Sequence, residues 1–528
     1  MKSLWDEAEA SRYVGDLAQR VYSSRLLSRD PSLVLHGGGN TSVKTRIRDI
    51  FGEEVGVLYV KGRGRDLATL DQAGFAPCRL LHLLRLSSLD ALSDEEMERE
   101  LKLASIDPAA PAASVETLLH AILPAKFVDH THSDALIAVM NTPSGSARVK
   151  EIYGDRVIIV PYAMPGFKLA RLCKEFVEEH AKGSAIGMIL MNHGIFTFGE
   201  TAKSAYERMI ELVDRAEQYL NERGAWNIKW PQLPQIPSVS RLEIAELRRA
   251  VSSAAGIPLI MSTHTDAQTV GFAHRSDIST LAGRSGVTPD HVIRTKRTPL
   301  VARDVASYCR EYQQYVYAHA NGGTVASVDS APRVILDPEL GLCVFGKTAA
   351  DAAIAEDIYR HTIDIIVRAE KLEKWCALPA KDFFEVEFWD MERAKLGNRS
   401  SAFPFNWRNR AHVILLEKWR STPHWTRLCA RSAGCMLILN AAIFPKSTAI
   451  ATLSTDAWRK VMNINLDSNL ILMRECHPLL KGKSEELTMR STNTPISSSG
   501  ARPSPNRIVW RDRDGVMGSF RPSCGHPC

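Results

Sequence analysis

Several features are missing from this chain of 528 residues, and each absence excludes a class of protein. The N-terminus, Met1 to Arg12, is polar and charged and lacks the apolar core of a signal peptide. No uninterrupted apolar run is long enough to span a bilayer. The ten cysteines are scattered and form no Cys-x-x-Cys pair, which favours free thiols in a cytosolic protein. We therefore expect a cytoplasmic protein that has no membrane partner.

Most of the chain has no excess of positive charge, and the excess is concentrated near its end. Residues 398–528 hold 19 Lys and Arg against 8 Asp and Glu, a net charge of +11, whereas residues 1–397 carry a net charge of −5. The overall +6 therefore comes from one segment and not from a basic surface on the main body. We expect no nucleic-acid partner.

The composition is otherwise that of a globular protein. Apolar residues make up 45% and charged residues 24%, which excludes a collagen-like or wholly disordered chain. The length predicts about three domains. A Pro-rich stretch at roughly 230–237 closes a first domain, 1–229, and a second α/β domain is expected at 238–392. A partial domain at 398–483 and a disordered basic tail at 484–528, rich in Ser, Pro, Arg and Gly, are expected to follow.

Apolar patterning in the first domain indicates alternating strands and helices. We expect a strand that begins near Ser32 and enters a tight glycine turn. A helix at 114–123 is expected to be capped by Ser114, and a strand to begin at Phe127. Residues 189–198 read as one strand, and 202–221 as a long helix.

A short repeat links the two main domains. Residues 194–205 (GIFTFGETAKSA) and 341–352 (GLCVFGKTAADA) share six of twelve positions without a gap. We interpret the second domain as a degenerate copy of the first. A weaker alignment upstream places Arg294 opposite His130 and Lys296 opposite His132. The alternative is a coincidental similarity between two strand–turn–helix segments.

Three histidines have the spacing of a metal site. His130 and His132 are two residues apart in a strand-like segment, so both side chains point to one face of the sheet. His193 follows an apolar strand, in Asn192-His193-Gly194. Three imidazoles suit a divalent metal such as Zn²⁺ and leave a coordination position open for catalysis. The alternative is three unrelated core or surface histidines.

Glu116 is the candidate acid/base. It precedes His120 by one helical turn, so both lie on one helix face. A carboxylate beside a Lewis-acidic metal can move a proton at a carbon or oxygen whose charge the metal stabilises. The alternative is an ordinary glutamate in a first helical turn, and His120 itself favours a structural role.

A glycine cluster, His36-Gly-Gly-Gly-Asn-Thr-Ser42, exposes backbone N–H groups and is flanked by hydroxyl residues. Such a turn can bind phosphate oxygens. An esterase oxyanion turn also begins with His-Gly-Gly-Gly, but it requires a Gly-x-Ser-x-Gly nucleophile motif, which the chain lacks. The alternative is a tight turn that binds no ligand.

Together these motifs resemble the class II aldolase/adducin family over roughly residues 10–225. The resemblance implies an α/β/α sandwich around a mainly antiparallel sheet, usually in homo-oligomers with sites between subunits. It implies Zn²⁺ or another divalent metal on His130, His132 and His193, and Glu116 as acid/base. It also implies substrate phosphate on Gly39, Asn40, Thr41, Ser42 and Ser114, and on the loop residues Gly62, Arg63 and Gly64. Arg63 departs from the pattern, because a small hydroxyl residue is usual there.

Two further segments, 288–297 and 333–338, resemble a subgroup of bifunctional rhamnulose-1-phosphate aldolase/short-chain dehydrogenases. The resemblance implies cleavage of rhamnulose 1-phosphate to dihydroxyacetone phosphate and lactaldehyde in sugar catabolism. Two other functions remain open at this stage: NAD-dependent oxidation of the aldehyde product, and a non-catalytic adducin-like interaction module.

The last quarter resembles a short-chain dehydrogenase only over about 437–483. Such an enzyme needs a Gly-rich phosphate turn and a Tyr-x-x-x-Lys pair. No Gly-x-Gly-x-x-Gly occurs between 398 and 436, and no tyrosine follows Tyr359. We therefore expect an incomplete Rossmann-like remnant, no NAD cofactor and no dehydrogenase activity. Out-of-frame translation of residues 398–436 and 484–528, on either side of the remnant, is one explanation for their sequence.

Overall fold

The computed structural model describes residues 1–180, 183–231, 239–284, 286–288, 291–320 and 328–397, together with four short strands beyond them. The chain divides into two units, Met1–Phe405 and Asn406–Cys528. In the second unit β12 (His412–Val413) pairs with β13 (Cys435–Met436) in parallel, and β14 (Leu487–Met489) pairs with β15 (Ile508–Trp510) in antiparallel fashion. The predicted dehydrogenase remnant (398–483) and basic tail (484–528) otherwise lie outside the described residues, so both stay predictions.

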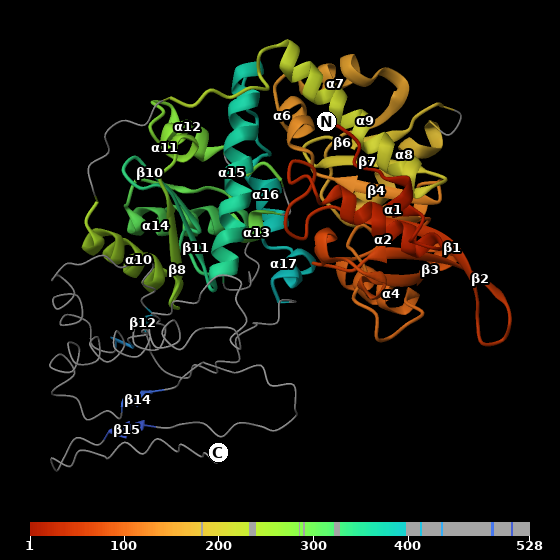
Figure 1. Cartoon of the computed structure of the whole chain (residues 1–528), viewed down its shortest axis with the longest axis horizontal. Helices are drawn as coiled ribbons and strands as arrows, with labels where there is room; N and C mark the ends of the chain where they lie inside the picture. Colours follow the sequence, from red (N-terminus) through yellow and green to blue (C-terminus); the bar gives the residue numbers. More distant parts are fainter. Residues whose placement is uncertain are drawn as a thin grey trace, which may run out of the picture. The chain divides into compact units, whose positions relative to one another are not determined.

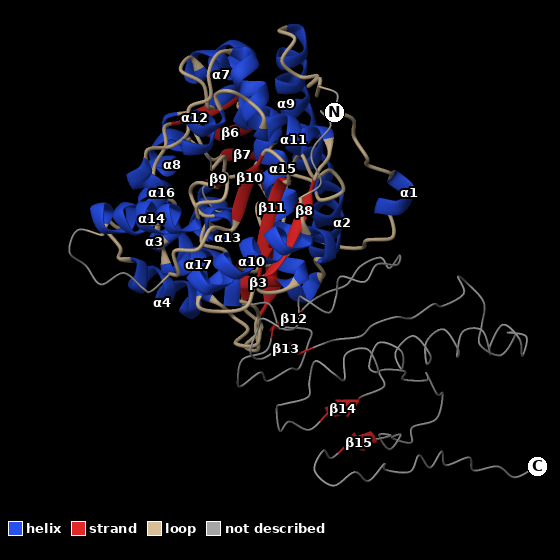
Figure 2. Ribbon diagram, turned by 90° about the vertical axis from the view of Figure 1, so that its left-hand side faces the viewer, coloured by secondary structure: helices blue, strands red, loops and turns tan. Residues whose placement is uncertain are grey.

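The N-terminal part of the first unit alternates helices and strands up to residue 222 (Figures 1 and 2). Its elements are α1 (Glu7–Ala10), α2 (Asp16–Leu27), β1 (Asn40–Arg48), β2 (Glu54–Lys61), η1 (Leu67–Thr69), η2 (Gln72–Gly74), β3 (Phe75–Arg79), α3 (Leu80–Leu86), α4 (Asp94–Ala104), α5 (Thr117–Ile122), β4 (Phe127–Thr131), α6 (Asp134–Met140), α7 (Gly145–Tyr153), η3 (Gly154–Arg156), β5 (Val157–Val160), α8 (Phe167–Glu179), β6 (Gly187–Leu190), β7 (Gly194–Gly199) and α9 (Ala202–Glu222).

These strands form a seven-stranded sheet in the order β3-β2-β1-β4-β7-β6-β5, in which β5 and β6 are the parallel pair. Apolar side chains of α2, α6, α7 and α9 pack in one hydrophobic cluster, and those of α3, α4, α5 and α8 in another. The result is the α/β/α sandwich that the sequence predicted, and this prediction is confirmed. The sheet brings β1, β4 and β7 side by side, which places Asn40 directly opposite His130 in the ladder.

Three local predictions were wrong. Residues 32–39 form no strand, because the left-handed backbone at Gly37 and Gly39 breaks any ladder before β1 begins at Asn40. Residues 189–198 form a hairpin of β6 and β7, with Asn192 at a φ of 58° in its turn. Helix α5 begins at Thr117 with Glu116 as its N-cap, and Ser114 lies outside the helix.

The C-terminal part of the first unit has a smaller sheet. Its elements are α10 (Arg241–Ala255), β8 (Ile260–His264), α11 (Ala267–Ala273), α12 (Ile278–Gly283), α13 (Val292–Thr295), β9 (Leu300–Val301), α14 (Val305–His319), β10 (Val334–Asp337), β11 (Gly341–Gly346), α15 (Ala349–Leu372), α16 (Ala380–Glu387) and α17 (Asp390–Gly397). The strand order is β8-β11-β10-β9. We call residues 239–397 the second domain and residues 1–231 the first.

The four strands of the second sheet have the same order and directions as four neighbouring strands of the first. In β4-β7-β6-β5 and in β8-β11-β10-β9 the first two pairings are antiparallel and the last is parallel. The equivalent helices α9 and α15 both begin after a threonine capping box, at Thr201 and Thr348. This match aligns β7 with β11, as the repeat in the sequence does.

The weak upstream alignment of that repeat was wrong. Arg294 lies in α13 and Lys296 caps its C-terminal end, so neither lies on a strand equivalent to β4. The strand register instead aligns Thr263 of β8 with His130 of β4. Thr263 pairs with Cys343, the third residue of β11, and His130 pairs with Phe196, the third residue of β7. The second domain therefore has no histidine at that position.

The two domains share a hydrophobic cluster. Helix α15 packs on α6, and their apolar residues Leu136, Tyr359 and Ile363 are less than 3% exposed within one cluster. Burying each large apolar side chain contributes roughly 1.5–3 kcal/mol. Next to this contact, His361 Nδ1 lies 2.6 Å from Asp134 Oδ2.

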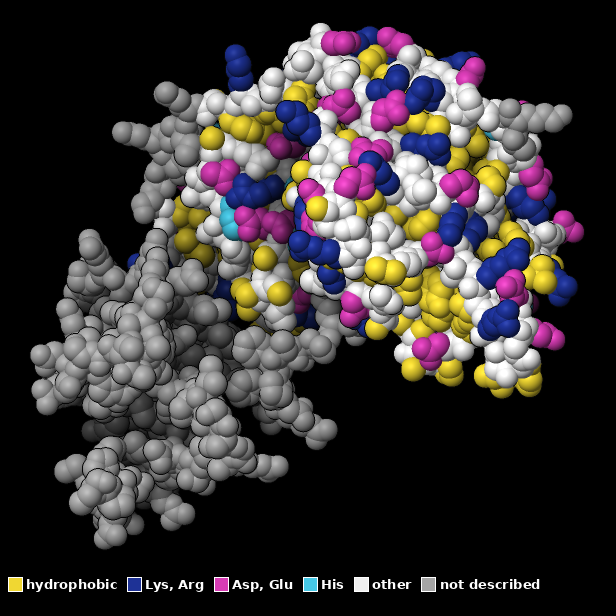
Figure 3. Space-filling view, turned by 45° about the vertical axis from the view of Figure 1, so that its right-hand side comes forward, with side chains coloured by type: hydrophobic (Ala, Val, Ile, Leu, Met, Phe, Trp, Pro, Cys, Tyr) yellow, Lys and Arg dark blue, Asp and Glu magenta, His cyan; other side chains and the backbone are white. Residues whose placement is uncertain are grey.

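Among the helices that the structure describes, none is both long and apolar enough to cross a membrane. Figure 3 shows acidic and basic side chains interspersed on the face in view.

Candidate active site

The three histidines predicted as metal ligands converge at one point. His130 is on β4, His132 follows β4, and His193 lies in the β6–β7 turn. All three are buried, and one nitrogen from each lies within 4.8 Å of the others. His130 Nε2 and His132 Nε2 are 3.0 Å apart. A tetrahedral Zn²⁺ site with Zn–N distances of about 2.0–2.1 Å separates its nitrogens by roughly 3.3–3.4 Å, so the cluster is close to the size that one ion requires.

Local contacts hold these imidazoles in place. His130 Nδ1 donates to the carbonyl oxygen of Ile195 at 3.0 Å, which directs Nε2 of the neutral ring toward the cluster. The ring also stacks on Phe196, with centroids 4.1 Å apart. Gly194 lets the strands approach this closely, because a Cβ there would lie 2.5 Å from the Thr131 carbonyl oxygen and 2.8 Å from His132 Cδ2. This contact explains the glycine in Asn192-His193-Gly194.

The donor set fits a divalent metal. His193 Nδ1 is buried, and no residue among those described accepts or donates a hydrogen bond to it. A buried polar nitrogen without a partner costs about 1–3 kcal/mol, so such a ring is unusual in a purely structural role. Three imidazoles beside one carboxylate are also the ligands and neighbour that catalytic zinc sites use.

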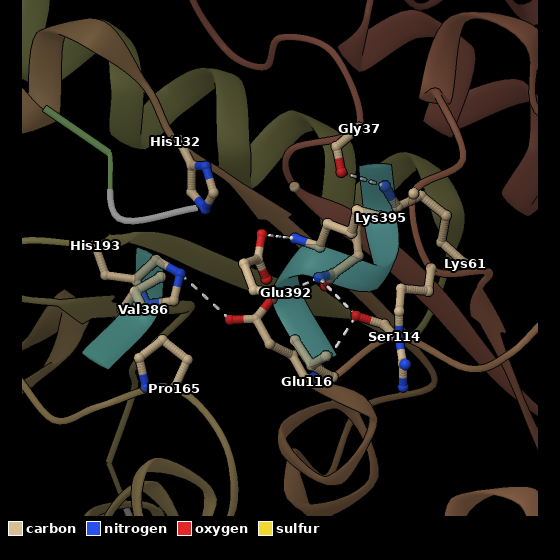
Figure 4. A pocket seen from close by; sticks show the side chains of 15 residues that line it. Gly37, Lys61, Ser114, Glu116, His132, Pro165, His193, Val386, Glu392 and Lys395 are labelled. Carbon is tan, nitrogen blue, oxygen red and sulfur yellow. Dashed lines mark hydrogen bonds and ion pairs between the residues drawn. The ribbon is translucent and has the colours of Figure 1, made fainter. Parts of the chain in front are cut away.

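Glu116 faces the histidine cluster from the start of α5. Its Oε2 atom lies 3.5 Å from His130 Nε2. Its Oε1 atom lies 3.4 Å from His193 Nε2 (Figure 4). The side chain of Asn40 donates to Oε2 at 2.5 Å. Burial opposes ionisation of Glu116, but His130, His193, the Asn40 amide and Lys395 outweigh it and lower its pKa. Glu116 is therefore a carboxylate at neutral pH, ready to accept a proton.

His120 belongs to the scaffold behind Glu116. Its Nε2 atom contacts Asn40 Oδ1, and its Nδ1 atom lies 2.8 Å from the hydroxyl oxygen of Ser42. Burial, followed by nearby cations, lowers the pKa of His120 well below its ordinary value, so the ring is neutral. A neutral ring that donates from Nε2 and accepts at Nδ1 satisfies both partners. It also fixes the Asn40 amide with its NH₂ group toward Glu116.

The predicted phosphate-binding residues divide into two groups. A cavity with about 480 Å³ of space, its open mouth included, is lined by Gly39, Asn40, Arg63, Gly64 and Ser114, together with Glu116, His132 and His193. The side chains of Thr41 and Ser42 turn elsewhere: Thr41 pairs with Ser24 at 2.8 Å, and Ser42 with His120. Gly62 forms an isolated bridge with Ala113 and does not line the cavity.

Arg63 directs its charge away from the cavity. Its guanidinium group donates to Glu98 at 2.5 Å, although the residue contributes to the cavity wall. Lys61, which also lines the cavity, donates to the carbonyl oxygens of Gly37 at 3.0 Å and Arg65 at 2.7 Å. Lys61 therefore holds the glycine loops together, whereas Arg63 ties its loop to α4.

Three residues that line the cavity come from the second domain and were not predicted from the sequence. Val386 at the end of α16, and Glu392 and Lys395 on α17, lie more than 190 residues beyond His193 in the chain and close the other side of the cavity. No motif marked them. Helix α17 is a short helix at the end of the second domain, and nothing in its sequence indicates that it contacts the first domain.

Two family models match this chain. Residues 18–220 match the class II aldolase and adducin N-terminal domain, and residues 239–396 match the second domain of class II aldolases. A curated relative from Bacillus subtilis (strain 168), the uncharacterized oxidoreductase YuxG, is 33% identical over 420 residues. The match covers 75% of this chain, and the chain spans about 60% of the length of that relative.

Solved structures with a similar N-terminal part include the class II aldolase domain of a conserved protein from Thermoplasma acidophilum. It is 43% identical, with a TM-score of 0.39, and the match covers 42% of this chain and 99% of that one. L-fuculose-1-phosphate aldolase from Thermus thermophilus is 18% identical, with a TM-score of 0.27, and the match covers 40% of this chain and 96% of that one. The two family models span most of residues 18–396, and this part of the chain consists of two class II aldolase domains, the first of the aldolase and adducin type.

Proposed function

We propose that this protein is a metal-dependent aldolase that cleaves a ketose 1-phosphate, with rhamnulose 1-phosphate as the substrate and dihydroxyacetone phosphate and lactaldehyde as the products. The observation that carries the proposal is the buried Glu116 carboxylate, within 3.5 Å of two of the three clustered histidines. His130, His132 and His193 would hold the divalent metal, Zn²⁺ in the simplest case. When bound, it would polarise the ketose oxygens and stabilise the enediolate that cleavage leaves.

The reaction requires one proton to move. Breaking the C3–C4 bond turns the C4 hydroxyl into an aldehyde and leaves an electron pair on C3, so the hydroxyl proton must end on C3. Glu116 is suited to both transfers, because it is ionised before cleavage and can accept the C4 hydroxyl proton, which it then returns to C3. The Asn40 amide holds the carboxylate in place through both steps.

The substrate phosphate is proposed to bind at the glycine turn. Gly39 has a φ of 56°, and a Cβ there would lie 2.6 Å from the His130 carbonyl oxygen, so the turn packs directly against β4 at His130. Ser114 reaches the same cavity and accepts from Asn40 at 3.2 Å. Backbone N–H groups and a hydroxyl beside a metal suit a small sugar phosphate.

An aldol-cleavage assay with rhamnulose 1-phosphate, with and without chelator, tests the proposal. We expect chelator-sensitive release of dihydroxyacetone phosphate, restored by Zn²⁺ or another divalent metal. Glu116→Gln should abolish turnover while it keeps the metal, and Glu179→Gln, an exposed glutamate on α8, is the matched control. Turnover that survives complete metal removal would contradict the proposal.

The Bacillus subtilis relative bears the word oxidoreductase in its name. We propose that this chain has no NAD-dependent dehydrogenase activity, because residues 398–528 contain no tyrosine for a Tyr-x-x-x-Lys pair. Titration with NAD tests this, and saturable binding would contradict it. We also propose a cytoplasmic homo-oligomer, which light scattering on the purified full chain tests.

A further inference from the structure

The second domain docks against the active site through the segment that leads into α17. Trp389 and Met391 are about 6% and 5% exposed and belong to a hydrophobic cluster whose other members come from the first domain. The indole Nε1 of Trp389 donates to Asp94 Oδ2 at 2.8 Å. Two buried apolar side chains and one hydrogen bond thus fix the start of α17 on the first domain (Figure 1).

The rest of α17 then lies across the cavity. The Cα atom of Lys395 would lie 3.5 Å from a Cβ built on Gly64, so the helix backbone touches the glycine loop. Lys395 Nζ lies 2.6 Å from Glu392 Oε1, and both side chains line the cavity on the side opposite the histidines (Figure 4). The Lys395 side chain is 15% exposed, so its charge is directed inward.

Lys395 differs from the other two cations of the cavity. The ammonium group of Lys61 is bound to backbone carbonyls of its own loops, and Arg63 is bound to Glu98 outside the cavity. Lys395 instead pairs with a residue of the cavity wall itself, Glu392, three residues earlier on the same helix. An ammonium group has three N–H donors, so it can serve Glu392 and an anion together.

We propose that Lys395 is a substrate-binding residue, which the second domain supplies to the first domain's site, and that its ammonium group binds the phosphate of the substrate. This inference rests on the proposed function, because it takes the anion to be a sugar phosphate. Glu392 is the positioning residue that holds the ammonium group over the cavity before substrate arrives.

Physical chemistry supports this assignment. A lysine acts on phosphate as a point charge with several donors, and a charge-assisted hydrogen bond is strong in a cavity with little water. Lys395 lines the same cavity as Glu116 and His193, which places its charge at the site of the proposed reaction. The second domain would thus complete a site that the first domain leaves open on one side.

Inorganic phosphate is the probe, and calorimetric titration of the metal-loaded full chain is the measurement. We expect Lys395→Met to weaken phosphate binding by roughly 10- to 100-fold, the value of one charge-assisted hydrogen bond, and Lys395→Arg to restore part of it. The matched control, Lys381→Met, removes an exposed lysine of α16 and should bind as the wild type does. In the cleavage assay Lys395→Met should raise KM more than it lowers kcat.

Three outcomes would overturn the inference: no phosphate binding by the wild type, unchanged binding by Lys395→Met, or equal loss in Lys381→Met. All three are measurements of phosphate binding and do not depend on the cleavage assay. A chain that binds phosphate through Lys395 but cleaves no sugar phosphate would therefore contradict only the proposed function. Metal content and thermal unfolding show whether Lys395→Met is folded. If it is not, Lys395→Gln decides, because it removes the charge and keeps a polar side chain: phosphate binding as tight as that of the wild type would overturn the inference.

Discussion

The hydroxyl oxygen of Ser42 lies 2.8 Å from Nδ1 of His120, and the other nitrogen of this ring contacts the side chain of Asn40. The Asn40 amide in turn donates to Glu116. The orientation of the candidate acid/base is therefore set by a buried chain of hydrogen bonds that begins on β1 and returns to it. Ser42 supports the site from behind, where its hydroxyl does not reach the cavity.

Replacing the ring of His120 should damage catalysis without removing the metal. In His120→Phe the aromatic packing is kept, but the Asn40 amide loses its partner and is free to rotate away from Glu116. We expect kcat for aldol cleavage to fall by about 10- to 100-fold, the usual cost of removing an outer-shell partner, with zinc content near the wild-type value. The control is His180→Phe, which changes an exposed histidine at the end of α8. An unchanged kcat in His120→Phe would show that Asn40 needs no such support.

The three histidines should act as one metal-binding unit. We expect His130→Ala and His132→Ala, alone or together, to reduce bound metal after gel filtration by more than about tenfold, because each removes one of three protein ligands. His193→Ala should behave in the same way. The measurement is metal content by plasma mass spectrometry beside the cleavage assay. Full metal content and full activity in the double variant would exclude this site.

The fold and the site differ in how much of them the sequence predicts. Apolar periodicity predicts α9, and the spacing of His130 and His132 predicts a shared face of β4, because both signals are local. The sequence could not show that β6 and β7 form a hairpin, since a single positive φ at Asn192 reverses an apolar run that otherwise reads as one strand. The contribution of α17 depends on docking between domains, which leaves no local pattern.

Glycine at position 194 should be intolerant of a single methyl group. A Cβ there would lie 2.5 Å from the carbonyl oxygen of Thr131 and within 3 Å of both His130 and His132. We expect Gly194→Ala to destabilise the fold by roughly 1–3 kcal/mol, as overpacking does, and to weaken metal binding because the imidazoles must move. Gly283→Ala is the control, because a Cβ at that helical position meets nothing within 4 Å. Thermal unfolding and metal titration of both variants check the prediction.

An ion pair in the second domain should make stability depend on acid pH. Arg303 Nε donates to Asp337 Oδ2 at 2.6 Å, and Arg303 Nη2 donates to Oδ1 at 2.9 Å. Burial opposes ionisation of Asp337, but Arg303 and the backbone N–H groups of Leu340 and Glu339 outweigh it, so the pKa of Asp337 is below its ordinary value. The folded state therefore binds this proton more weakly than the unfolded state does.

The sign follows from linkage. A lowered pKa in the folded state contributes stability above the unfolded-state pKa of about 3.9, and this contribution is lost as the pH falls through the folded-state pKa. We expect Asp337→Asn to lower the free energy of unfolding by roughly 1.5–3 kcal/mol at pH 7, the range for a hydrogen bond to a charged group. The difference between wild type and variant should shrink below about pH 4, where the wild-type carboxyl group also becomes neutral. Urea unfolding of both chains from pH 7 to pH 3 measures it, and a difference that is constant over this range would mean that Asp337 stabilises the domain through its shape and not through its charge.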